Sequence, residues 1–123
     1  MEQCNLSFCK FFKHSESLLE AILDKSVDLG VDHANEVNNT LKTMFTVPYG
    51  VLVDIRNDFT FDFEGGVEIG NSALEKRVAL LIHRKKTETA ARCLIHMQKA
   101  SFPEKELKIF YDRELAIKWL EKI

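Results

Sequence analysis

Three stretches of nearly continuous apolar residues divide the chain. Tyr49–Ile55, Arg77–His83 and Leu107–Asp112 are rich in Val, Leu, Ile and aromatic residues and contain few polar positions. Apolar runs of this length, without polar alternation, are typical of strands that are covered on both faces, as in a parallel sheet. The pattern therefore predicts three buried strands.

Segments with a helical period precede or follow these strands. The clearest has apolar residues every three or four positions, and with Asp32 as N-cap and Pro48 as terminator it predicts a helix over His33–Phe45. Similar apolar stripes follow Thr87 and Asp112, each of which can cap a helix. The alternation of strand and helix predicts right-handed crossovers and an α/β fold in which helices cover parallel strands.

The N-terminal part of the chain is compatible with two structures. Leu6–Phe12 is rich in aromatic residues and predicts a first strand. The next apolar segment, Ser15–Asp24, fits a short helix and a hairpin partner about equally well. The sequence has no internal repeat, low-complexity segment or linker, so we expect residues 1–123 to form a single domain.

Length, charge and cysteine content narrow the class of protein. A chain of 123 residues with 46% hydrophobic residues can bury the core of one ordinary domain. The formal net charge of −2 argues against nucleic-acid binding by bulk electrostatics. No apolar run reaches the ~18–20 residues of a transmembrane helix, and the start of the chain lacks the basic region of a signal peptide. Three cysteines without a CxxC motif predict a cytoplasmic protein with free thiols.

Residue types that form metal sites and active sites are scattered. The histidines show no HExxH spacing, and Cys4, Cys9 and His14 are more widely spaced than the ligands of closed zinc sites. There is no GxSxG motif, and the glycines of Glu64–Asn71 match no nucleotide-binding pattern. We therefore predict no catalytic residue, no metal and no cofactor.

Two charged features lie at the ends of predicted strands. Asp54 and Arg56 are two residues apart on one strand, so they share a face and are expected to form an ion pair. The basic run His83–Lys86 follows another strand, at the edge where ligands dock in open α/β sheets. This run fits either an anion-binding site or a solvated turn.

Four segments in order resemble a known family. They are VDHANEVNNTLKTM, VLVDIRN with the following FTF, RVALLIH, and the C-terminal LKIFYDRELAIKWLEKI. Together they resemble the STAS superfamily, the fold of anti-sigma-factor antagonists, and more narrowly its small bacterial SpoIIAA-like members, which are linked by fold to lipid-binding Sec14 domains. The resemblance covers Gly30–Ile123. It implies a mixed sheet of about five strands with about four helices, in the order ββαβαβαβα. It also implies that Leu6–Phe12 and Leu18–Leu23 form an N-terminal hairpin.

One junction of the chain matches the regulatory site of this family. In anti-sigma-factor antagonists, a partner kinase phosphorylates a serine at the start of a helix, and the added charge blocks partner binding. The matching segment here is Asn57–Asp62, which lacks the aspartate–serine pair of the family. Thr60 is its only hydroxyl group, and Asp62 already supplies a carboxylate. The resemblance therefore implies Thr60 as a possible modification site.

The combined interpretation is a non-catalytic, cytoplasmic, regulatory module that binds a protein partner or forms a homodimer. We expect Thr60 to cap a helix over residues 61–75 and Phe59 to lie in the core. One of the two following phenylalanines is then expected to be exposed, as at an interface. The residues expected to form the binding surface are Asp58, Thr60, Phe61, Asp62 and Phe63.

An alternative interpretation is a protein of the Sec14-like type that binds a small apolar ligand or a lipid. Glycines beside bulky phenylalanines favour this interpretation, since they leave room for rearrangement. It requires a cavity between the segment Phe59–Ile69 and the predicted helix around Ala90–Met97.

Overall fold

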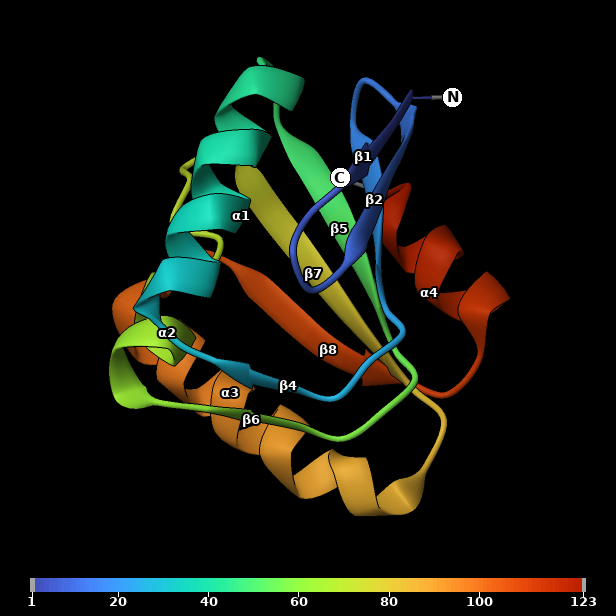
Figure 1. The fold of residues 1–123 in the computed structure, drawn as a ribbon. Helices are drawn as coiled ribbons and strands as arrows, with labels where there is room; N and C mark the ends of the chain where they lie inside the picture. The colour runs from blue at the N-terminus through green and yellow to red at the C-terminus, as the bar shows by residue number, and fades with distance from the viewer. Residues whose placement is uncertain (1, 123) are drawn as a thin grey trace.

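The computed structural model describes residues 2–122, in which a six-stranded mixed sheet is combined with a two-stranded sheet and four α-helices (Figure 1). The strand order in the large sheet is β1-β2-β3-β5-β7-β8. The first three strands pair antiparallel, whereas β3, β5, β7 and β8 run parallel. Their bounds are β1 (Glu2–Asn5), β2 (Lys10–Ser15), β3 (Leu18–Leu23), β5 (Tyr49–Ile55), β7 (Glu75–Ile82) and β8 (Glu106–Phe110).

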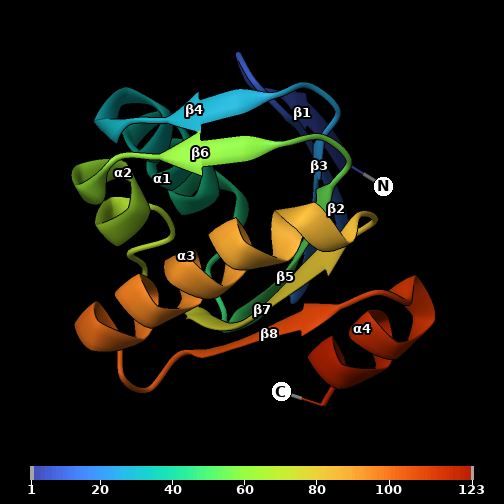
Figure 2. The ribbon, with the colours of Figure 1, turned by 90° about the horizontal axis from the view of Figure 1, so that it is seen from below.

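The helices cover the two faces of the large sheet unequally. Figures 1 and 2 show α1, α2 and α3 on one face, together with the small sheet of β4 and β6, and α4 alone on the other face. Among residues 2–122, no helix has both the length and the apolar character needed to cross a membrane. The bounds are α1 (Val31–Met44), α2 (Phe63–Glu68), α3 (Glu88–Ser101), α4 (Arg113–Leu120), β4 (Val27–Leu29) and β6 (Phe59–Phe61).

The central strands confirm the α/β prediction, and their side chains divide into two apolar cores. On β5, Val51 and Ile55 face the larger core, under α1 and α3, whereas Leu52 faces the smaller core under α4. Successive side chains of a strand point to opposite faces, so a strand between two cores must be apolar throughout. The residues buried in the smaller core are Leu52, Ala79, Leu81, Phe110, Ala116 and Leu120.

The N-terminal hairpin confirms one predicted strand, Leu18–Leu23, and corrects the bounds of the other. Leu18–Leu23 is a strand rather than a helix, and it pairs antiparallel with β2 and parallel with β5. The predicted first strand, Leu6–Phe12, is wrong in its bounds, because a turn closed by the hydrogen bond from Leu6 N to Cys9 O interrupts it. The turn lets Phe8 pack edge-to-face on the ring of His33, with ring centroids 4.8 Å apart. The aromatic residues of this segment thus serve packing rather than one continuous strand.

The helix caps confirm one prediction and correct another. Asp112 caps α4 as predicted, and its carboxylate accepts hydrogen bonds from the backbone N–H groups of Glu114 and Leu115. Asp32 does not cap α1, which begins earlier, after Gly30. The ring nitrogen Nδ1 of His33 accepts the backbone N–H of Gly30 at 3.1 Å, so histidine occupies the place of a capping-box glutamate.

The junction after β5 departs most from the prediction. Phe59–Phe61 is a strand, β6, that pairs parallel with β4, so Thr60 lies within a strand and is not a helix cap. Asp62 is the N-cap of α2 instead, and the helix ends at Glu68 rather than near residue 75. Gly70 then adopts a positive φ of 69°, a conformation that favours glycine. The large sheet has six strands rather than the predicted five, and the small sheet adds two more.

Candidate functional site

The predicted binding residues lie on the segment that leads through β6 into α2. Asp58 precedes β6 and pairs with Arg84 Nη2 at 3.0 Å and Lys86 Nζ at 3.3 Å. All three side chains are largely exposed, so these pairs contribute little stability. The two cations, Arg84 and Lys86, belong to the basic run His83–Lys86, and both contact the Asp58 carboxylate of the same chain.

The next polar residues hold the local structure. Thr60 Oγ1 donates a hydrogen bond to Asp28 Oδ1 at 2.7 Å, which links β6 to β4 on their exposed side. Asp62 Oδ1 accepts the backbone N–H of Gly65 at 2.7 Å and so caps α2. A phosphate on Thr60 would break the first bond and would be placed beside the carboxylate of Asp28.

The three phenylalanines of this segment lie at three different depths. Phe59 is buried, as predicted, and Phe61 is half-buried, with the two ring centroids 6.1 Å apart. Phe63 is 71% exposed, the most exposed large apolar side chain among residues 2–122. The two phenylalanines of the predicted binding surface therefore have different environments. Phe61 packs against the core, whereas Phe63 faces solvent.

Two glycines let the inner side of α2 pack closely against its neighbours. The inner side of α2 is formed by Gly65 and Gly66, both buried. A β-carbon on Gly65 would lie 2.5 Å from the carbonyl oxygen of Leu29, and one on Gly66 would lie 2.6 Å from the sulfur of Met97. At Gly65 the neighbour is backbone, so α2 approaches Leu29 at backbone distance, whereas Gly66 leaves room for the side chains of Met97 and Phe61 against the helix.

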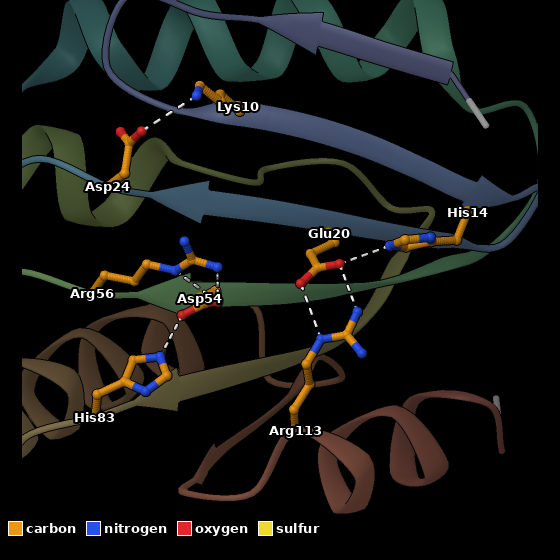
Figure 3. A network of polar contacts seen from close by, with 8 residues as sticks. All are labelled: Lys10, His14, Glu20, Asp24, Asp54, Arg56, His83 and Arg113. Carbon is orange, nitrogen blue, oxygen red and sulfur yellow. Dashed lines mark hydrogen bonds and ion pairs between the residues drawn. The ribbon is translucent and has the colours of Figure 1, made fainter.

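A second polar group lies at the carboxyl ends of the parallel strands, on the α4 face of the sheet. Figure 3 shows Asp54, at the end of β5, between His83 and Arg56. The distance from Asp54 Oδ1 to His83 Nε2 is 2.6 Å, and that from Asp54 Oδ2 to Arg56 Nη2 is 3.1 Å. The predicted ion pair of Asp54 and Arg56 is therefore confirmed, and His83 joins it from the neighbouring strand.

A third polar group surrounds Glu20 on β3. Its carboxylate accepts hydrogen bonds from Arg113 Nη2 at 2.8 Å and Nε at 3.2 Å, and it lies 2.8 Å from His14 Nε2 (Figure 3). Burial alone would raise the pKa of Glu20, but the hydrogen bonds from Arg113 and His14 outweigh it and hold the pKa below its usual range. The same carboxylate raises the pKa of Arg113.

The hydrogen-bond partners of Asp54 and Glu20 limit the chemistry that these two groups can perform. A carboxylate that orients a histidine is one half of a nucleophile-activating triad. Within residues 2–122, however, neither His83 nor His14 is hydrogen-bonded to a hydroxyl or thiol group. Arginines occupy the remaining oxygens of both buried carboxylates, so one set joins β2, β3 and α4 and the other joins the ends of β5 and β7.

An apolar cavity of about 90 Å³ lies within the larger core. Its walls come from the sheet, from α1 and α3, and from Leu29 and Phe59 of the small sheet. Ile69 and Leu94 also line it, so it lies between the two segments named for the apolar-ligand interpretation. Its volume is well below the ~300–1,000 Å³ of pockets that hold drug-sized ligands, and a lipid chain would not fit without expansion.

One end of this cavity is polar. Glu75 lines it, and its Oε2 lies 2.9 Å from Lys105 Nζ in an ion pair whose side chains are 5% and 4% exposed. Lys105 also donates to the carbonyl oxygen of Gly70 at 2.8 Å. Gln98 of α3 lines the same end, and its Nε2 donates to the carbonyl oxygens of Gly66 and Ile69. Gln98 ties α2 and the following loop to α3, and the ion pair ties that loop to the start of β7 and to the residue before β8.

Only some of these polar contacts can be predicted from the sequence. Asp54 and Arg56 are close in sequence, which revealed their pairing, whereas Glu20 and Arg113 are 93 residues apart. A glutamate within the apolar strand LLEAIL was the one available hint of a buried polar contact. No group of three or more His, Cys, Asp or Glu side chains within residues 2–122 is arranged to hold a metal ion.

Comparison with known proteins identifies no family for this chain. The chain matches no protein-family model, no curated protein and no solved structure. The resemblance to STAS domains therefore stays a prediction.

Proposed function

We propose that this protein is a non-catalytic, regulatory interaction module of STAS-like type, which uses Phe63 as the anchor of a protein-binding surface. The observation that carries this proposal is the exposure of Phe63, 71%, on a helix that close glycine packing holds in place. A large apolar side chain that is already positioned loses little conformational entropy when a partner covers it. Aromatic side chains of this kind are frequent binding hot spots.

The surroundings of Phe63 define the chemistry of the partner. Asp62 and Glu64 flank it and are exposed, so the ring lies in an acidic setting. A complementary surface offers an apolar pocket with basic residues around its rim. Such a surface belongs either to another protein or to a second copy of this chain.

Photocross-linking tests the proposal. Benzoylphenylalanine placed at position 63 should give one defined product, either a dimer of the purified protein or a complex with a partner in cells. The matched control carries the same group at Leu115, which is 57% exposed and lies on α4. We expect the product from position 63 and not from position 115.

Competition then distinguishes a specific surface from chance contact. Unlabelled wild-type protein should suppress the product, whereas unlabelled Phe63→Ser should not, because it lacks the anchor. Equal products from the two labelled positions, or equal competition by both proteins, would show that Phe63 is an ordinary surface residue.

A further inference from the structure

The cavity in the larger core is unusual for a domain of this size. Protein interiors are packed as densely as organic crystals, with few voids larger than a water molecule. A void of about 90 Å³ costs stability, because the side chains that surround it lose contacts. The walls are nearly all apolar, so bulk water gains little by filling the space. A small apolar molecule would regain the lost contacts.

Gln98 supplies an unfilled hydrogen-bond acceptor at the polar end of this cavity. Its side-chain nitrogen donates to backbone carbonyl groups of the α2 region, but its Oε1 accepts no hydrogen bond from residues 2–122. Every fully enclosed side-chain polar atom in this part of the chain has a partner, so Oε1 must border open space. Gln98 is 2% exposed, and the cavity is the open space that it lines.

The volume limits what can enter. An engineered cavity of roughly 150 Å³ holds benzene, so a cavity of about 90 Å³ suits about three or four carbon atoms. We propose that this cavity is a binding site for a small alcohol-like molecule, with an apolar body of that size and one hydroxyl group that donates to Gln98 Oε1. The site is separate from Phe63, which faces solvent on α2.

Two simple probes of equal size test the ligand class. 2-Propanol and acetone have the same number of heavy atoms, but only 2-propanol can donate a hydrogen bond. Each is titrated into the full-length protein, and the methyl signals of Val37 and Leu94, which line the cavity, are followed by NMR. We expect saturable shifts at these wall residues with 2-propanol and binding at least several-fold weaker with acetone.

Two variants fill the cavity from the β-sheet side. Ala21→Val and Val53→Ile each add carbon atoms to a strand residue that lines the space. Both should lose the saturable response to 2-propanol while keeping the folded spectrum and an equal or higher melting temperature. Wild-type shifts that never saturate, or filled variants that bind as well as wild type, would overturn the site. Equal binding of acetone and 2-propanol would overturn the role of Gln98 and the hydroxyl-bearing class of ligand.

Discussion

Arg113, the first residue of α4, donates two hydrogen bonds to the carboxylate of Glu20 in β3. Nη2 lies 2.8 Å from Oε1, and Nε lies 3.2 Å from Oε2. The glutamate is 6% exposed, whereas the side chain of Arg113 is 49% exposed. One contact thus joins the only helix on its face, within residues 2–122, to a strand 93 residues earlier in the chain.

Replacing Glu20 should destabilise the fold more than replacing an exposed glutamate. Glu20→Gln removes the negative charge beside Arg113 and His14 and replaces one of its two acceptor oxygens with an NH2 donor, and we expect a loss of about 1–3 kcal/mol in the free energy of unfolding. Glu106→Gln is the control, because Glu106 is 58% exposed in its pair with Arg77 and should cost less than about 1 kcal/mol. Urea denaturation measures both, and equal losses would contradict the structural role of Glu20.

The contribution of Glu20 should depend on pH. Its pKa is lowered in the folded protein, so the unfolded chain binds the proton more readily. The stability from the charged form is therefore complete above the ordinary glutamate pKa of about 4.3 and is lost as pH falls through the lower folded value. The difference in unfolding free energy between wild type and Glu20→Gln should be constant near neutral pH and shrink in acid. A difference that grows in acid would reverse this assignment.

Gly65 should tolerate no side chain, although its backbone conformation is ordinary. The β-carbon of Gly65→Ala would lie 2.5 Å from a backbone oxygen of Leu29, so α2 must move, at a cost of about 1–3 kcal/mol. Gly30→Ala is the matched control, since its nearest contact is an ordinary 3.5 Å, and it should cost less than about 1 kcal/mol. Thermal melting compares the two. If Gly65→Ala is as stable as Gly30→Ala, close packing does not hold α2.

A negative charge at position 60 should loosen the small sheet. Thr60→Val removes the hydrogen bond to Asp28 and should cost about 1 kcal/mol. Thr60→Glu removes the same bond and adds repulsion between two carboxylates, so it should cost more. Hydrogen exchange at the β4 and β6 amides should rise in the order wild type, valine, glutamate. Equal exchange in the two variants would argue against an electrostatic switch at Thr60.

Sequence patterns within short windows correctly predict the central strands and several of the helices. The strands at Tyr49–Ile55 and Arg77–His83, the helix before the first of them and the cap at Asp112 follow from composition and spacing within short windows. The burial of Phe59 follows from the same kind of local signal. Local signals do not predict the strand Phe59–Phe61, because three residues carry almost no periodic signal and its partner, β4, lies more than 30 residues earlier.

Composition and spacing alone establish which segments are buried on both sides and in what order they follow, since an uninterrupted apolar run can be stable only inside a layered fold. The contact of Arg113 with Glu20, the exposure of Phe63 rather than Phe61, and the cavity beside Gln98 become visible only in the folded molecule. These features depend on how segments distant in the chain pack together. Burial, charge pairing and free volume are properties of the packed assembly and of no single segment.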